Sequence, residues 1–306
     1  MICIPAGFCS SHKTGVFVVS DKQPPVSRIA RARAAALPFQ VSIACWIDLR
    51  GYGASIAAAN FNPMHREAAP AIKRLRRFHE IVADHSHRRF PTLVINDGAI
   101  AFRDLSLRSR NVGFDFLCRS WNLFKAVNAA EPHDDYRGAR AIVAVGFRSR
   151  GRRRSRGFSS DHFSSIMERL ASGALSQEQA LFEAASVQPH FDIVPQLQAN
   201  FAFTKAYLAD ETGGSSGLTG SNFYADNALF DPGCPPWIDA EGPISWEHEK
   251  LGLKAEFLRI KDLQVRHHPE GGPIEVRDGL RVAKALAPDS SVMDAIQKAE
   301  RYKHGG

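Results

Sequence analysis

The sequence lacks any uninterrupted apolar run of about 18 residues, so it contains no candidate transmembrane helix and no membrane partner is expected. Its five cysteines are scattered and form no Cys-x-x-Cys pair, which excludes a disulfide framework and a cysteine-bound zinc site. Residues 1–20 lack a basic start followed by a long apolar stretch, so no secretory signal is expected. Together these absences favour a cytoplasmic protein in a reducing compartment.

Acidic residues are in deficit. The chain has 39 Lys and Arg residues against 32 Asp and Glu residues, a net charge of +7, which favours anionic partners such as nucleotides or nucleic acid. Hydrophobic residues make up 44% and charged residues 23% of the 306 positions, as in ordinary globular proteins. This composition excludes a disordered, collagen-like or coiled-coil chain and leaves enough apolar residues for a core.

Hydrophobic patterns from residue 39 onward predict strands and helices in alternation. Residues 41–49 are apolar on both faces and predict a central strand, and residues 92–95 and 99–102 flank an Asn-Asp-Gly turn that predicts a hairpin. Further strands are predicted over 140–147, 222–230 and within 244–260, and helices over 54–59, 66–83, 112–130, 164–172, 177–185 and 199–209. This order predicts an α+β fold with a mainly antiparallel sheet flanked by helices, and its βαββαβ start is typical of a ferredoxin-like core.

The chain divides by composition into three parts. Residues 1–38 contain a Pro-Pro pair and are expected to form an N-terminal arm or tail. Residues 39–265 are expected to form the main domain, with a basic insertion at about 148–196 that contains short helices. Residues 266–306 are weakly patterned and are expected to form a C-terminal segment. Residues 148–156 contain six arginines. This segment is expected either to form a solvated loop or to bind an anion.

Two aspartates lie where predicted strands end. Asp48 follows five apolar residues and precedes a bend at Gly51 and Gly53, and Asp97 occupies the hairpin turn. Each also has a purely structural explanation, since Asp48 can cap the next helix and Asp-Gly is a preferred turn pair. In an antiparallel sheet the end of the first strand and the turn of the later hairpin can lie side by side, where two carboxylates can hold cations such as Mg²⁺ or Mn²⁺. The glycines would let backbone N–H groups approach a triphosphate.

The same segments resemble a known family. Residues 47–52 (IDLRGY) resemble the first-strand signature of class III nucleotidyl cyclases, and residues 95–102 (INDGAIAF) resemble their hairpin signature. The resemblance covers about residues 39–147 and extends more loosely to 199–230. Within that superfamily the chain is most similar to the cyclases of bacterial Pycsar antiphage systems, which make cyclic UMP or cyclic CMP to switch on a separate effector.

The resemblance implies a pyrimidine nucleotide cyclase, and a uridylate cyclase in particular. Such a lyase converts UTP (or CTP) to the 3′,5′-cyclic monophosphate and pyrophosphate in antiphage defence. The resemblance also implies two divalent cations, Mn²⁺ or Mg²⁺, held by the catalytic residues Asp48 and Asp97 and by the backbone carbonyl of Leu49. It further implies a homodimer with sites at the interface and a separate effector that the cyclic nucleotide activates. The candidate substrate-binding residues are Gly51, Tyr52, Gly53, Arg103 and Lys205.

The chain departs from the adenylate cyclases, or from many class III enzymes, at two points, of which the first favours a pyrimidine substrate and the second leaves other functions open. Leu93 stands where adenylate cyclases carry a purine-recognising lysine, and residues 203–207 lack the Asn/Arg pair that many class III enzymes carry on their fourth helix. The second departure motivates a catalytically inactive, cyclase-like protein that binds a nucleotide. A basic nucleic-acid-binding protein is the third alternative, although aromatic residues are not interleaved with the arginine run as stacking platforms require.

Overall fold

The computed structural model describes residues 37, 39–131, 137–149, 158–187, 194–232, 235–264, 276–287 and 290–301. The expected N-terminal arm, apart from Leu37, lies outside the described residues, as do residues 150–156 of the arginine run. Within the described ranges, no helix combines the length and the apolar character needed to cross a membrane.

The described residues form seven strands and eight α-helices. The strands are β1 (Phe39–Leu49), β2 (Thr92–Ile95), β3 (Gly98–Asp104), β4 (Ala139–Ser149), β5 (Phe223–Asp226), β6 (Ile238–His248) and β7 (Leu253–Leu263). The helices are α2 (Tyr52–Ala58), α3 (Ala68–His85), α4 (Asn111–Ala129), α5 (Phe158–Ala171), α6 (Gln177–Ser186), α7 (Phe201–Glu211), α8 (Gly279–Leu286) and α9 (Ser290–Arg301).

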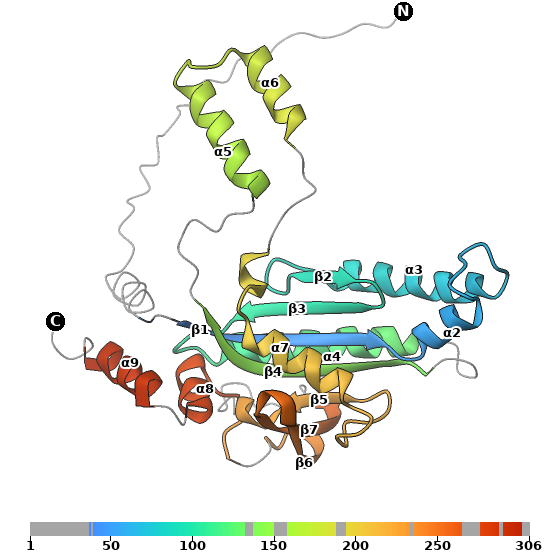
Figure 1. Cartoon of the computed structure of the whole chain (residues 1–306). Helices are drawn as coiled ribbons and strands as arrows, with labels where there is room; N and C mark the ends of the chain where they lie inside the picture. Colours follow the sequence, from blue (N-terminus) through green and yellow to red (C-terminus); the bar gives the residue numbers. More distant parts are fainter. Residues whose placement is uncertain are drawn as a thin grey trace, which may run out of the picture. The chain divides into compact units, whose positions relative to one another are not determined.

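The strands form one sheet in the order β2-β3-β1-β4-β5-β7-β6 (Figure 1). Every neighbouring pair is antiparallel except β4 and β5, which are parallel. This mixed architecture confirms the prediction of a mainly antiparallel sheet flanked by helices. Strand β1 lies between β3 and β4 and pairs with β4 along its whole length, from Phe39 opposite Ser149 to Leu49 opposite Ala139. Its central position explains why its sequence is apolar on both faces.

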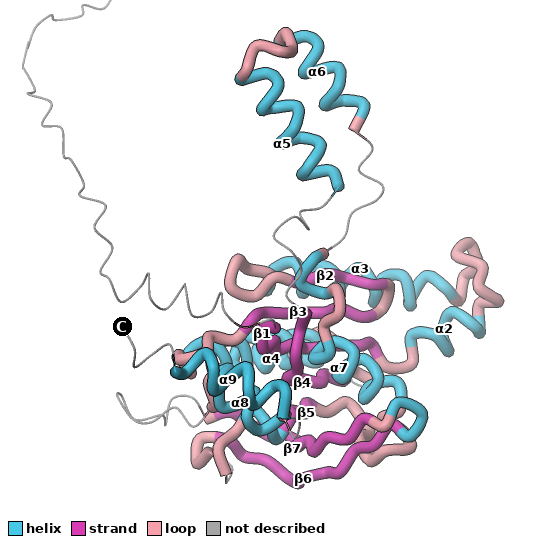
Figure 2. Tube along the Cα trace, turned by 60° about the vertical axis from the view of Figure 1, so that its left-hand side comes forward, coloured by secondary structure: helices cyan, strands magenta, loops and turns pink. Residues whose placement is uncertain are grey.

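Helices cover both faces of the sheet (Figure 2). On one face, α3, α4 and α8 pack on a buried cluster that includes Ile43 and Ile47 of β1. On the other face, α7 packs through small residues at helical spacing, namely Ala202, Ala206 and Ala209, all fully buried. The side chains of β1 therefore alternate between two separate apolar layers.

Two features fix α7 on the sheet. A Cβ atom at Gly146 of β4 would lie 2.5 Å from the backbone nitrogen of Ala202, so the glycine permits the close approach of helix and strand. The Asn200 side chain caps the helix by accepting a hydrogen bond from Phe203 N at 3.1 Å, and it donates to Ser42 Oγ of β1 at 3.1 Å. The start of α7 is thereby tied directly to the central strand.

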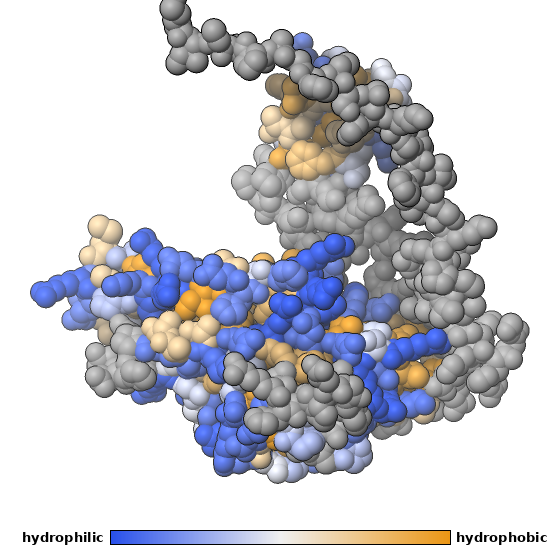
Figure 3. Space-filling model, turned by 180° about the vertical axis from the view of Figure 1, so that it is seen from behind, coloured by the Kyte–Doolittle hydropathy of each residue, from blue (hydrophilic) through white to orange (hydrophobic). Residues whose placement is uncertain are grey.

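Helices α5 and α6 form a two-helix hairpin within the predicted insertion (Figures 1 and 2). Ser176 and Gln179 form a capping box at the start of α6. The hairpin has a small buried core of its own, made by Ile166, Leu175 and Ala180. Other apolar side chains of the hairpin stay exposed (Figure 3), namely Phe163, Met167, Leu181 and Phe182.

Helices α8 and α9 occupy a stretch for which the sequence patterns predicted no elements. Asp278 caps α8 by accepting a hydrogen bond from Arg281 N at 2.9 Å. Val282 and Ala283 of α8 are fully buried in the same cluster as the core strand β1. The short helix is therefore stabilised by its cap and by packing on the sheet rather than by a long amphipathic pattern.

Candidate active site

Strand pairing brings Asp48 and Asp97 together. Asp48 of β1 lies opposite Gly98 of β3, and Leu49 N donates a hydrogen bond to the carbonyl oxygen of Asp97 at 3.0 Å. Asp97 occupies the turn of the β2–β3 hairpin, where Asn96 adopts a φ of 54° and donates to the Asp97 carboxylate at 2.8 Å. The strand end and the hairpin turn therefore lie side by side, as the sequence analysis expects.

The carboxyl group of Asp48 lies among other acids. Burial, followed by the negative charges of Asp210 and Asp97, raises its pKa from 3.8 to about 8, against the opposing positive charges of Arg140 and Arg50. Ionisation of this carboxyl group is therefore disfavoured. A divalent cation would offset both the burial of negative charge and the repulsion between carboxylates, so the chemistry of these residues fits a metal ion.

Asp210 and Arg140 also belong to this site, although the sequence patterns did not single them out. Arg140 lies opposite Asp48 on β4, and Asp210 lies at the end of α7. The Arg140 guanidinium donates to the Asp210 carboxylate and to the carbonyl oxygen of Leu218, the latter at 2.8 Å. Trp46 Nε1 donates to Asp210 at 3.2 Å. In the sequence, Arg140 is the first residue of the strand predicted over 140–147, and Asp210 directly follows the helix predicted over 199–209.

Three guanidinium groups gather next to these acids. Arg50 donates to the carbonyl oxygen of Gly220 at 3.4 Å, and burial together with the positive charges of Arg140 and Arg137 lowers its pKa. The Arg137 side chain lies beside Gly51, which adopts a φ of 78°. The turn that follows Asp48 is therefore positively charged, which suits a polyphosphate.

Three of the predicted substrate-binding residues, Gly51, Tyr52 and Gly53, lie at this turn. Burial and the negative charge of Asp97 raise the pKa of Tyr52, so its phenol group lies within electrostatic reach of that carboxylate. A Cβ atom at Gly53 would meet no atom within 4 Å, which leaves open space beside the turn.

The other two predicted substrate-binding residues are engaged elsewhere. Arg103 lies near the end of β3 that is opposite to the hairpin turn, and it donates to Asp115 at 3.2 Å. Lys205, in the middle of α7, donates to the buried carboxylate of Asp226 at 2.7 Å. The structure therefore does not bring them to the paired aspartates.

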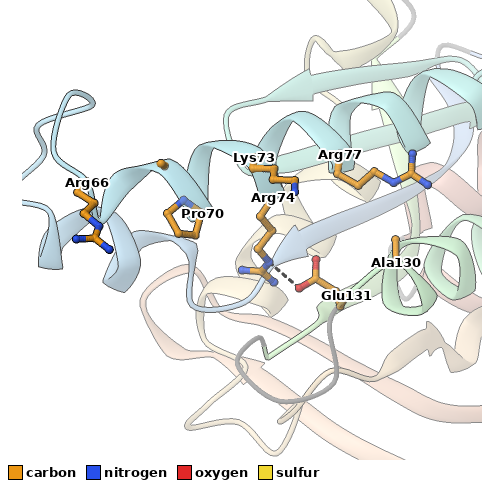
Figure 4. Close-up of a pocket in the computed structure, with 8 residues that line it drawn as sticks. Arg66, Pro70, Lys73, Arg74, Arg77, Ala130 and Glu131 are labelled. Carbon is orange, nitrogen blue, oxygen red and sulfur yellow. Dashed lines mark hydrogen bonds and ion pairs between the residues drawn. The ribbon is translucent and has the colours of Figure 1, made fainter.

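Arg74 of α3 supports the turn from the other side of the sheet. Its buried guanidinium donates to the carbonyl oxygens of Arg50 and Gly138, at 3.0 and 3.1 Å. It also donates to the Glu131 carboxylate at 2.6 Å (Figure 4). Arg50 N in turn donates to the Gly138 carbonyl at 2.9 Å. One side chain thus connects the end of β1, the approach to β4 and the end of α4, and helical spacing in the sequence gave no sign of it.

Apolar side chains are exposed on the face of the sheet that carries Asp48. Cross-strand pairing through β3 places Leu93 and Ile95 of β2 on this face, where they are 36% and 46% exposed. Tyr207 of α7 is 45% exposed and contacts the Trp46 ring edge-on, with centroids 5.3 Å apart. Exposed apolar groups beside a polar site are typical of an interface.

Among the residues that the structure describes, no group of three or more His, Cys, Asp and Glu side chains could hold a metal ion. A cation at this site would therefore depend on the carboxylates of Asp48 and Asp97 and on a backbone oxygen. The carbonyl of Leu49 is the backbone oxygen that the resemblance to class III cyclases implies.

No family model matches this sequence, and no curated protein matches it. Among solved structures, the chain is similar to one described as the crystal structure of the guanylyl cyclase Cya2, at 10% sequence identity and a TM-score of 0.43. The match covers 74% of this chain and 94% of that chain. A similarity of this extent carries no weight for function, which rests on the residues of the site.

Proposed function

We propose that this protein is a nucleotidyl cyclase that converts UTP or CTP to the 3′,5′-cyclic monophosphate and pyrophosphate. The observation that carries the proposal is the pairing of β1 with β3, which sets Asp48 beside the turn that holds Asp97. Two carboxylates on neighbouring strands, next to a positively charged turn, are suited to metal-assisted phosphoryl transfer.

The arrangement of elements supports a ferredoxin-like, class III cyclase core. Strand β1, helix α3, strands β2 and β3, helix α4 and strand β4 follow one another in βαββαβ order. Their four strands lie in the order β2-β3-β1-β4 within the sheet, and β5, β7 and β6 extend it. In this core the two aspartates lie at the same edge because β1 and β3 are antiparallel neighbours.

Asp48, Asp97 and the carbonyl of Leu49 would hold two divalent cations, Mn²⁺ or Mg²⁺. When bound, these cations supply the charge that stabilises the α-phosphate and the leaving pyrophosphate in the transition state. The raised pKa of Asp48 supports the assignment, since burial and two neighbouring carboxylates disfavour its negative charge and a divalent cation would offset both effects.

The turn after Asp48 would bind the triphosphate chain. Arg50, Arg137 and Arg140 supply positive charge there. Arg140 is bound to Asp210 in this structure, so it would have to leave that carboxylate to contact a phosphate oxygen. The left-handed backbone at Gly51 lets the main chain approach a ligand without a side chain in the way.

A pyrimidine base is supported by Leu93, the residue at the position of the purine-recognising lysine. A leucine side chain has no donor for a purine ring nitrogen. As in the Pycsar systems that the sequence resembles, the cyclic product would act in the cytoplasm as a second messenger in antiphage defence. It would activate a separate effector.

A homodimer is supported by the apolar residues on the face of Asp48. Leu93, Ile95 and Tyr207 are exposed next to the site, and a second copy packed there would bury them. Such a pairing would place each site at the interface and exclude water from it.

Incubation of the purified protein with ATP, GTP, CTP or UTP and Mn²⁺, with products resolved by mass, tests the proposal. We expect cyclic UMP or cyclic CMP from the wild-type protein and none from Asp48→Asn or Asp97→Asn. Asp239→Asn, at an exposed aspartate of β6, is the matched control and should retain full activity. Unchanged turnover in Asp48→Asn would refute the assignment of the site.

A cyclase-like protein that binds nucleotide without turnover is the second candidate, and helix α7 favours it. Asn200 is 1% exposed and serves as the helix cap, while Lys205 is bound to Asp226. Neither side chain is therefore free to contact a substrate in this structure. Metal-dependent binding of UTP with no cyclic product from any nucleotide would identify this function.

A further inference from the structure

A second cationic pocket lies beside α3, the helix that packs on the opposite face of the sheet from Asp48. Its volume is about 570 Å³. Pro70, Lys73 and Arg77 of α3, together with Arg66 from the turn before the helix, line one side of the pocket (Figure 4). The end of α4 lines the other side. The residues that line this pocket do not include Asp48 or Asp97.

The pocket has more positive than negative charge. Its one lining carboxylate, Glu131, is bound to the buried guanidinium of Arg74 at 2.6 Å, so that pair is internally neutral. Arg77 pairs with Glu80 at 3.4 Å, in an exposed contact that solvent weakens. Arg66 and Lys73 form no ion pair among the described residues. Like charges held along one groove repel one another, and a bound polyanion would offset that repulsion.

The surface between these cations is apolar and made of small side chains. Ala69, Pro70 and Ala130 line it and leave room for a flat ring. The volume lies within the range of about 300–1,000 Å³ that is usual for small-molecule sites. A ligand that fits both features combines a planar ring with a chain of negative charges.

We propose that this pocket binds a nucleoside polyphosphate at a site separate from the catalytic one. The phosphate chain would lie between Arg66 and Lys73, and the ring would lie against Pro70. Arginine and lysine side chains are the usual partners of phosphate oxygens. The site does not depend on Asp48, Asp97 or a metal ion, so it stands whether or not the protein is a cyclase.

Binding measured in EDTA separates this pocket from the metal-dependent site. The full chain carrying Asp48→Ala and Asp97→Ala is titrated with ATP, tripolyphosphate and adenosine by calorimetry at about 0.15 M salt. We expect ATP to bind more tightly than tripolyphosphate, and adenosine to bind least. Adding Arg66→Ala and Lys73→Ala should weaken ATP binding by about tenfold or more, because two charge-assisted contacts are lost.

The matched control is the pair Arg76→Ala and Arg88→Ala, which removes the same charge from exposed positions outside the pocket. An equal loss of affinity in this control would show a general electrostatic effect and overturn the proposal. No ATP binding in EDTA would also overturn it. Tripolyphosphate binding as tightly as ATP would refute the contact between the ring and the apolar surface. All four exposed positions should tolerate alanine, which urea unfolding of each variant checks.

Discussion

At the scale of single residues, Asp48 is a group whose ionisation the folded chain disfavours. Its carboxyl is partly buried beside Asp97 and Asp210, and its pKa of about 8 follows from that burial and from their negative charges. That Asp48 has charged neighbours was predictable from sequence, because a carboxylate directly after a buried strand needs a partner. The role of Asp210 was not, because only the packing of α7 on the sheet brings it there.

The pH dependence of stability tests this electrostatic environment. The pKa of Asp48 is higher in the folded state than its ordinary value of 3.8, so its contribution to stability is full below about pH 4 and is lost as the pH rises through 8. Asp48→Asn removes the ionisation. In urea unfolding with EDTA, we expect the variant to be more stable than wild type by on the order of 1–3 kcal/mol near pH 8, and about equal near pH 4. A difference that does not vary with pH would contradict the prediction.

Gly98 should tolerate no side chain. A Cβ atom there would lie 2.3 Å from Cζ2 of Trp46, a buried ring that donates to Asp210 and contacts Tyr207. We expect Gly98→Ala to lower the free energy of unfolding by about 1–3 kcal/mol, measured by urea denaturation. Gly53→Ala is the control, since a Cβ atom meets nothing within 4 Å there and the helix gains up to about 1 kcal/mol. Equal effects of the two variants would refute the close contact of β3 with Trp46.

At the scale of elements, Arg74 connects three segments that meet behind the site. A lysine ammonium cannot reproduce the planar fork that reaches Arg50, Gly138 and Glu131 together. We expect Arg74→Lys to lower the free energy of unfolding by about 1–3 kcal/mol. Arg76→Lys, at an exposed position of the same helix, should change it by less than about 0.5 kcal/mol. Chemical denaturation of both variants checks this, and equal stability would refute the connection.

The elements themselves were largely predictable, and the misses have physical causes. The central strand and the hairpin over 92–102 were predicted because local apolar patterns and turn residues specify them. Within residues 244–260 the sequence predicted strand structure without its boundaries, whereas the structure has the hairpin of β6 and β7. Register shifts in this hairpin interrupt the regular alternation of side chains between the two faces. Helix α8 was missed because it has only eight residues and depends on burial of Val282 and Ala283.

At the scale of the whole molecule, the apolar residues beside Asp48 predict association of two copies. Leu93→Lys should place a charge in that interface and convert a dimer to a monomer in sedimentation velocity. Leu251→Lys replaces a leucine that is 58% exposed in the turn between β6 and β7, and it should leave the dimer intact. A wild-type monomer would refute the dimer. A dimer that survives Leu93→Lys would place the interface elsewhere.

The candidate site shows which long-range features a sequence reveals. Asp48 and Asp97 lie in two short motifs, so their juxtaposition followed from the expected strand pairing. Arg140 and Asp210 reach the site from β4 and α7, and their mutual ion pair joins residues 70 positions apart. No local pattern reports such a contact. Sequence therefore predicted the acidic pair, and only the folded chain revealed the charges that surround it.

The bonds made by Arg74 have a consequence for genetics. Its guanidinium holds the two backbone carbonyls behind the Asp48 turn, yet it lies on the far face of the sheet from that residue. In a random-mutagenesis screen for lost activity, substitutions at Arg74 would be recovered alongside those at Asp48 and Asp97. If the chain is the proposed cyclase, a map drawn from such alleles would extend the apparent active site through the sheet, to a residue on the opposite face from Asp48.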